Sequence, residues 1–132
     1  MQDLKAYVSS LAPAEGALQG AASHISSQDC LAALIWWSLV QASNARLHKA
    51  NTVVVYPINL RSRMHPVVPM NYCGNAWISM HENTGKCTIK DLIGSESGIR
   101  MAACSIRQGL LTLTPAYLEA HLRTLSTKRP SP

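Results

Sequence analysis

Residues 51–77 read NTVVVYPINLRSRMHPVVPMNYCGNAW, and this stretch organises the rest of the chain. It opens with residues 52–56, a β-branched and aromatic run that is too short to be a helix. The run is also too uniformly apolar for a strand with one face in water. It therefore predicts a buried strand, which Pro57 ends or confines to a sheet edge.

The next residues alternate between apolar and polar side chains. Alternation places Ile58 and Leu60 on one face of an extended chain. The opposite face then carries Asn59, Arg61 and Arg63. Two guanidinium groups on one face of a chain that leaves the core need an anionic partner.

Two prolines shape the chain after these arginines. Pro66 and Pro69 force an extended connector, because each fixes φ and lacks an amide donor. Gly74 then permits a tight turn or a close approach of the backbone. Residues 76–80 follow as a second short strand, which we expect to pair in one sheet with residues 53–56.

A capping box predicts where the main helix begins. In this motif the hydroxyl of Ser26 accepts an otherwise unpaired amide, and the carboxylate of Asp29 bonds back to the cap. We expect the helix to run to about Arg46. Its apolar arc is wide, which means burial on more than one side. The arc consists of Cys30, Leu31, Leu34, Ile35, Trp37 and Leu39.

The segment from about residue 97 also shows helical periodicity. Its apolar residues recur at the spacing of one helix face. They are Ile99, Met101, Ala102, Ala103, Ile106 and Leu110. Arg100 and Arg107 are expected to face away from this stripe.

The remaining elements are short. Thr114 is a cap and Pro115 suits the first helical position, so a last helix is expected over residues 116–125. Residues 1–11 can form one short helix or turn. Polar connectors are expected at residues 13–23 and 82–86.

Composition bounds the fold. A chain of 132 residues is one domain by size. Its residues are 47% hydrophobic and 14% charged, which is little charge for a soluble domain and fits a piece of a larger body. Two strands and three helices are too few to close a sheet unaided. The expected fold class is α/β, as a partial two-layer sandwich.

The formal net charge of +5 raises the question of nucleic acid. The basic residues are scattered, however, and no aromatic residues interleave with them as a stacking platform. We therefore expect no nucleic-acid partner, and an anionic small molecule fits the charge better.

The cysteines are Cys30, Cys73, Cys87 and Cys104, and they show neither Cys-x-x-Cys spacing nor paired histidines. No metal site is therefore expected. Two disulfides are possible in principle, but Cys30 and Cys104 fall on apolar helix faces where free thiols pack as small hydrophobic groups. No apolar run approaches the ~20 residues of a membrane span. We expect a reducing, cytoplasmic location without membrane contact.

The order of these features resembles the CoA-dependent acyltransferases called BAHD, relatives of chloramphenicol acetyltransferase that include fungal trichothecene 3-O-acetyltransferases. Members carry a strand ending in an arginine, a proline-rich connector and a Tyr-aromatic-Gly-Asn-Ala motif. Residues 59–63, 66–69 and 72–76 look like these features, with Cys73 in place of the usual aromatic residue. The likeness continues in residues 25–36 and 99–117. It covers most of the chain but only part of a whole family enzyme.

The resemblance implies a fold and an activity. The fold is a partial chloramphenicol-acetyltransferase-like sandwich, with residues 1–25 as crossover connector, 26–127 as part of an acyltransferase domain and 128–132 as a disordered tail. The activity is acyl transfer from a CoA thioester to an alcohol or amine of a secondary metabolite. Acyl-CoA is then the co-substrate, a small hydroxylated molecule is the acceptor, and no cofactor is bound covalently.

The two catalytic signatures of the resembled family do not occur in the chain. These are His-x-x-x-Asp, whose histidine is the general base, and Asp-Phe-Gly-Trp-Gly. The nearest string, from His24 to Asp29, has four intervening residues instead of three. No catalytic residue is therefore expected, and the chain is interpreted as a fragment or truncated form that is inactive alone. The alternative is a non-catalytic remnant that binds a partner, itself or a missing N-terminal half.

The resemblance also assigns roles to residues of the connector. The residues expected to support the active site are Arg61, Asn59, Gly74 and Asn75, and those expected to contact CoA are Arg63 and Tyr72. Arg61 matches the arginine that pairs with the motif aspartate, although it could also cap a strand in water. Gly74 and Asn75 could instead form only a conformational turn, and Arg63 could be a solvated surface charge.

Overall fold

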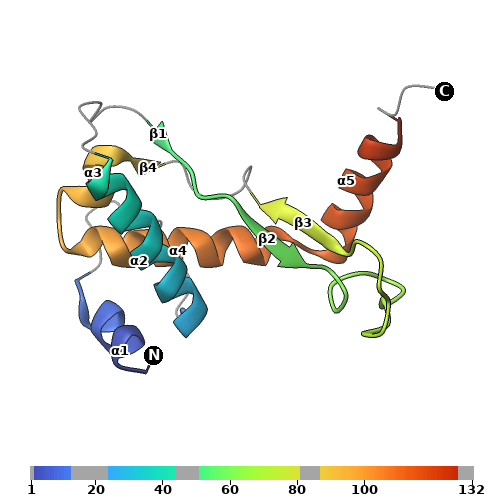
Figure 1. Cartoon of the computed structure of the whole chain (residues 1–132), viewed down its shortest axis with the longest axis horizontal. Helices are drawn as coiled ribbons and strands as arrows, with labels where there is room; N and C mark the ends of the chain where they lie inside the picture. Colours follow the sequence, from blue (N-terminus) through green and yellow to red (C-terminus); the bar gives the residue numbers. More distant parts are fainter. Residues whose placement is uncertain (1, 13–23, 44–50, 81–86, 128–132) are drawn as a thin grey trace.

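The computed structural model describes residues 2–12, 24–43, 51–80 and 87–127. The connectors expected at residues 13–23 and 82–86 and the expected tail at 128–132 lie outside these ranges. The described residues form five helices and four short strands, so the α/β class is confirmed. The helices are α1 (Gln2–Ser10), α2 (Ser27–Ala42), α3 (Ile89–Ile93), α4 (Ser97–Thr112) and α5 (Pro115–Thr127). The strands are β1 (Asn51–Thr52), β2 (Tyr56–Asn59), β3 (Trp77–Met80) and β4 (Cys87–Thr88) (Figure 1).

Helix α2 begins where its capping box predicts. The Ser26 hydroxyl accepts the Asp29 amide at 3.2 Å, and the Asp29 carboxylate accepts the Ser26 amide at 2.6 Å. The helix ends at Ala42, earlier than the expected Arg46, and the amide of its C-cap Ser43 bonds to Leu39. A similar box between Thr88 and Asp91 starts α3, a short helix that sequence analysis does not predict.

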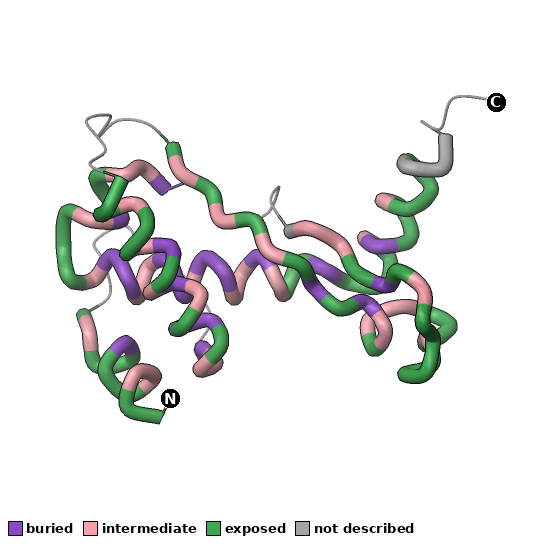
Figure 2. The backbone as a smooth tube through the Cα atoms, viewed as in Figure 1, coloured by how far each residue is buried: buried purple, intermediate pink, exposed green. Residues whose placement is uncertain are grey.

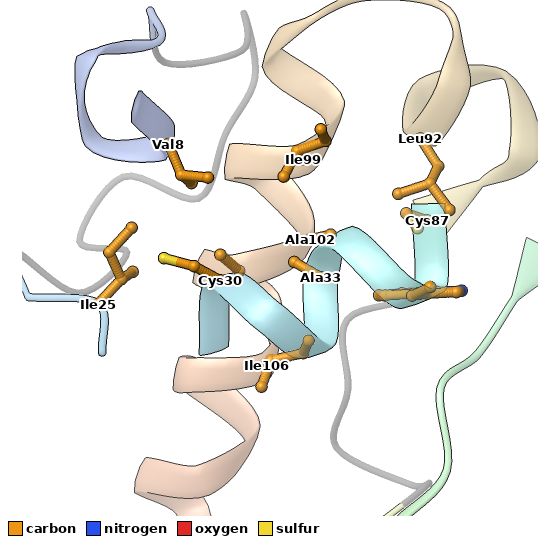
Figure 3. Close-up of a cluster of buried hydrophobic side chains, with 11 residues drawn as sticks. Val8, Ile25, Cys30, Ala33, Cys87, Leu92, Ile99, Ala102 and Ile106 are labelled. Carbon is orange, nitrogen blue, oxygen red and sulfur yellow. The ribbon is translucent and has the colours of Figure 1, made fainter. Parts of the chain in front are cut away.

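The larger core forms where α1, α2, α3 and α4 pack together. Small residues let α2 and α4 approach closely, because Ala33 on α2 and Ala102 on α4 are fully buried where the helices pack (Figure 3). Ala103 on α4 is fully buried as well. The turn from α3 into α4 depends on Gly98, since a Cβ at this position would meet the carbonyl oxygen of Leu92. The rest of this cluster is apolar: Val8, Ile25, Cys30, Trp36, Cys87, Leu92, Ile99 and Ile106.

The two arginines of α4 do not face away from the core as expected. Arg107 donates to the carboxylate of Asp29 on α2. Arg100 donates to the backbone carbonyls of Ser9 and Leu11, next to α1. The expectation was wrong because α1 and α2 pack against α4 and place a carboxylate and two backbone carbonyls within reach of these guanidinium groups.

The strands form two separate two-stranded antiparallel sheets. Strand β1 pairs with β4, and β2 pairs with β3 in a register that sets Tyr56 opposite Met80. The second strand of the sequence analysis therefore pairs with residues 56–59 rather than 53–56. Pro57 lies inside β2 instead of ending it, which an edge strand tolerates.

The expected buried strand over residues 52–56 is wrong. Only Asn51–Thr52 and Tyr56–Asn59 are strands, and Val53 and Val55 between them are 45% and 59% exposed. The reason is tertiary, because Val54 and Tyr56 pack against the larger core while no described element covers the opposite face, which carries Val53 and Val55. A uniformly apolar run indicates that a segment can be buried. Burial also requires a second element to cover the segment, and the run itself does not show whether one exists.

The smaller core lies between β2 and α5. It consists of Ile58, Leu60, Leu113 and Leu118. The predicted alternation is confirmed for the first two, which are buried while Asn59 between them is exposed. Thr114 caps α5 by accepting the Tyr117 amide at 3.2 Å, and Pro115 begins the helix as predicted.

Helix α4 and two side chains connect the two cores. Figure 1 shows α4 running from the helical end of the molecule toward the β2–β3 hairpin and α5. Tyr56 and Leu110 pack against both clusters. In Figure 2 buried positions recur along α4, while the connector after β2 is mostly exposed.

Candidate functional site

The candidate site is the connector of residues 62–75, which leaves the end of β2 and returns to β3. Arg61 stands at its base. The NH1 group of Arg61 donates to the amide oxygen of Asn59 at 3.2 Å. Its NH2 group donates to the carbonyl oxygens of Tyr72 at 2.8 Å and Gly74 at 3.4 Å. One guanidinium group therefore joins the end of β2 to the far end of the connector.

The backbone of the connector is tied to the same residue. The amide of Arg61 donates to the side chain of Asn59 at 3.0 Å, and the carbonyl of Arg61 accepts the amide of Val68 at 3.2 Å. The amide of Leu60 donates to the carbonyl of Ala76 at 2.9 Å, which closes the base of the connector next to the β2–β3 ladder. The peptide bond between His65 and Pro66 is cis.

Gly74 allows a close approach, as the sequence predicts. A Cβ at this position would overlap the phenol ring of Tyr72, whose side chain folds back over the glycine. Tyr72 is nonetheless 49% exposed, so its ring has one face on Gly74 and part of its surface in solvent. Any larger residue at position 74 displaces this ring.

The structure brings together four of the six residues that the sequence assigns to the site. Arg61, Asn59, Tyr72 and Gly74 form the network just described. Asn75 is exposed beside it. Arg63 lies elsewhere, because its NH1 group points to the carbonyl of Leu110 on α4 at 3.5 Å.

A second polar feature lies between α2 and α4, and the sequence analysis does not predict it. Asp29 is 2% exposed, and one of its carboxylate oxygens accepts Nε and NH2 of Arg107 at 2.8 and 2.5 Å. The same oxygen accepts the amide of Ser26. The sequence does hold one signal for this ion pair, which is an acidic capping residue on a helix with a wide apolar arc. Such a carboxylate is expected to be buried with the helix, and a buried carboxylate requires a cation.

Tyr56, the first residue of β2, lies near enough to this ion pair for Asp29 and Arg107 to influence its phenol. Burial raises the pKa of its phenol to about 12, and the negative charge of Asp29 adds to this rise while Arg107 and Arg63 oppose it. The Tyr56 hydroxyl, Trp37 Nε1 and Arg61 Nε are buried and have no hydrogen-bond partner among the described residues. A neutral phenol at this position cannot act as a base at neutral pH.

The cysteines are free thiols in different environments. Burial raises the pKa of Cys87 to about 11, and it also raises the pKa values of Cys30 and Cys104. These groups stay neutral near pH 7 and are poor nucleophiles. Cys73, in the connector, is exposed.

A depression of about 510 Å³ lies between the start of the connector and α5. Its lining is apolar except for His65, Glu119 and Arg123, and the last two form an exposed ion pair at 2.6 Å. Among the residues that the structure describes, no group of three or more His, Cys, Asp or Glu side chains could hold a metal ion. None of the described helices combines the length and apolar character needed to cross a membrane.

Comparison with known proteins gives two matches. A model of the Transferase family matches residues 11–112, a range that includes Arg61, the connector and the α2–α4 pair. The O-acetyltransferase cpsE of Aspergillus campestris (strain IBT 28561) is 42% identical to the chain over 55 residues. The alignment covers 41% of this chain and 11% of the fungal enzyme, so the chain spans a small part of that relative's length.

Proposed function

This chain belongs to the Transferase family, and we propose that it forms part of an acyltransferase that moves an acyl group from a CoA thioester to a hydroxyl group. The observation that carries the proposal is the family match over residues 11–112. The 42% identity with a fungal O-acetyltransferase supports an oxygen nucleophile as the acceptor. The acceptor itself is proposed only as a small hydroxylated molecule of secondary metabolism.

The reaction needs a base that the described residues do not supply. The acceptor oxygen attacks the thioester carbonyl, its proton passes to a general base, and CoA leaves as the thiol. The described histidines are His24, His65 and His121, and none has a hydrogen bond to a carboxylate that would orient it. No His-x-x-x-Asp string occurs in the 132 residues. We therefore place the base outside this chain and expect the chain alone to be inactive.

For CoA contact we propose Tyr72 and Arg63. Tyr72 offers an exposed aromatic surface, and its ring lies against Gly74. Arg63 offers a cation for a phosphate group, and this role requires its guanidinium to turn from the Leu110 carbonyl. Asn59, Arg61, Gly74 and Asn75 support this element without touching the reacting atoms.

The remaining proposals concern the setting of the site. The two small sheets fit a partial two-layer sandwich of the chloramphenicol acetyltransferase kind, which needs further strands because two-stranded sheets are marginal in water. The free thiols fit a reducing compartment, and we propose the cytoplasm.

Acetyl-CoA tests the proposal in two ways. In an NMR titration of the chain, we expect acetyl-CoA to shift the amide resonances of residues 61–75 and to leave those of α1 unchanged. In a thiol-release assay, we expect no acyl transfer above the buffer rate. The absence of shifts at millimolar acetyl-CoA would refute CoA binding by this connector. Acyl transfer by the chain that is lost when one of its histidines is mutated would refute the proposal that the general base lies outside this chain.

A second candidate function is self-association without catalysis. Leu31, Ile35 and Leu39 are exposed on one row of α2, and such a row favours burial against a second copy. Sedimentation of the chain should then show a concentration-dependent dimer, and Ile35→Lys should abolish it. A monomer at all concentrations would rule this candidate out.

A further inference from the structure

Arg61 is the point at which side-chain and backbone hydrogen bonds of the connector converge. Its guanidinium group reaches Asn59, Tyr72 and Gly74. Its own amide bonds to the Asn59 side chain, and its carbonyl accepts the Val68 amide. Arg61 is therefore bonded to the end of β2, to the middle of the connector and to its far end.

The partners of Arg61 are neutral oxygens rather than a carboxylate. Each acceptor of the guanidinium group is an amide side chain or a backbone carbonyl, and two of these acceptors belong to residues that lie 11 and 13 positions later in the chain. The planar guanidinium fork presents several donors in fixed directions, so one side chain can hold separate backbone segments at once. A lysine ammonium group has no such fork.

We propose that Arg61 is a positioning residue that ties the connector of residues 62–75 to the end of β2 and thereby holds the ring of Tyr72 over Gly74. The consequence for CoA, that this arrangement pre-organises Tyr72 for contact, rests on the proposed function. The positioning of the ring does not, because it follows from contacts within the chain.

The neighbouring arginine separates this role from a general effect of charge. Arg63 carries the same charge two residues away, but its guanidinium points to Leu110 on α4. Removal of the Arg63 side chain therefore changes the net charge by as much as removal of the Arg61 side chain does. It leaves the hydrogen bonds from Arg61 to Tyr72 and Gly74 intact. Arg63→Met is the matched control for Arg61→Met, since methionine keeps much of the apolar stem in both.

The readout is the NMR signal of the Gly74 α protons. An aromatic ring that lies against these protons shifts their resonance through its ring current, and this shift reports the position of Tyr72 rather than overall stability. In Arg61→Met we expect the signal to move toward the value of an unstructured glycine. The amides of Val68 and Tyr72, which donate to the backbone carbonyls of Arg61 and Pro69, should exchange with solvent at least about tenfold faster, because the guanidinium bonds that hold the connector closed are lost. Arg63→Met should leave both observations unchanged.

Two further variants keep the test decisive if Arg61→Met folds poorly. Arg61→Lys retains the charge but not the fork, so its Gly74 signal should move as in Arg61→Met. Asn59→Asp supplies a charged acceptor of nearly the same shape, so the Val68 and Tyr72 amides should exchange more slowly than in wild type. An unshifted Gly74 signal in both Arg61 variants, or equal changes in Arg63→Met, would overturn the proposal, as would faster exchange in Asn59→Asp.

An acetyl-CoA titration of the same variants separates this inference from the proposed function. If wild type binds acetyl-CoA, we expect Arg61→Lys to bind about tenfold more weakly, through loss of pre-organisation. If wild type does not bind, the proposed function fails, and the Gly74 signal still decides whether Arg61 positions the connector.

Discussion

The buried cluster around α2 and α4 contains eleven residues, whereas the cluster between β2 and α5 contains four. The larger cluster also includes a buried ion pair and the α2 capping box, so apolar burial and polar contacts act on the same helices. The smaller cluster lies beside the connector, whose far end accepts hydrogen bonds from Arg61. Stability is therefore concentrated at one end of α4 and the candidate site at the other. Binding elements commonly occupy the less stable regions of a fold.

The largest expected effect tests the ion pair in the larger core. Asp29→Asn keeps the shape of the side chain but leaves Arg107 without its carboxylate and weakens the α2 cap. We expect a loss of about 3–5 kcal/mol in the free energy of unfolding. Urea denaturation followed by circular dichroism measures it. Glu119→Gln is the control, because its ion pair with Arg123 is exposed and should cost at most ~1 kcal/mol.

The next prediction tests whether the smaller core opens separately. Leu118→Ala removes a nearly fully buried side chain and should cost about 2–3 kcal/mol. Hydrogen exchange should show the loss in α5 and β2, with α2 still protected. Leu122→Ala on the same helix should have a smaller effect, since Leu122 is exposed. Equal loss of protection in α2 would show that the two clusters unfold as one unit.

Two adjacent tryptophans give a smaller and more local comparison. Trp36 Nε1 donates to the Thr52 hydroxyl at 3.0 Å, whereas Trp37 Nε1 is buried without a partner among the described residues. Trp36→Phe loses a hydrogen bond, and Trp37→Phe removes an unsatisfied donor. We expect Trp36→Phe to be less stable than Trp37→Phe by about 1 kcal/mol in matched thermal melts. The reverse order of stability would contradict the hydrogen bond between Trp36 on α2 and Thr52 on β1.

The last comparison is a pH dependence at the junction of the two cores, which has little effect near neutral pH. The pKa of Tyr56 is raised by burial from 10.0 to about 12 in the folded chain. The unfolded phenol thus releases its proton first, so the contribution of Tyr56 to stability is complete below pH 10 and is lost as the pH rises to about 12. Denaturation midpoints between pH 9 and 12 should fall less steeply in Tyr56→Phe than in wild type. If the midpoints of wild type and Tyr56→Phe fall equally with pH, the Tyr56 hydroxyl is exposed to solvent rather than buried.

Several features of the fold follow from the sequence because they depend on neighbouring residues. The Ser26–Asp29 capping box, the Thr114–Pro115 helix start and the alternation of buried Ile58 and Leu60 with exposed Asn59 were all predicted correctly. Each involves residues at most four positions apart, so local geometry decides it. The family was also recognisable, because the arginine, the prolines and the glycine of the connector stand close together in the chain.

The sequence analysis identified residues of the candidate site but did not predict their hydrogen-bond partners. Arg61, Asn59 and Gly74 were assigned to support of the site and Tyr72 to CoA contact, and the structure brings these four residues together. The sequence pointed to a carboxylate for Arg61, whereas its described partners are an amide and two carbonyls. Backbone acceptors carry no signature in the sequence, so the nature of this bonding was not predictable.

The amino-acid sequence by itself determined the helix starts, the alternating face of β2 and the chemistry available in the connector, because these depend on interactions within one or two turns of chain. Only the tertiary structure decided that Val53 and Val55 are exposed and that Asp29 meets Arg107. It also decided that Arg61 is bonded to the end of β2 and to the far end of the connector. The physical reason is that burial and ion pairing depend on segments far apart in sequence, and the free energy of those contacts is set by which surfaces the folded chain brings together.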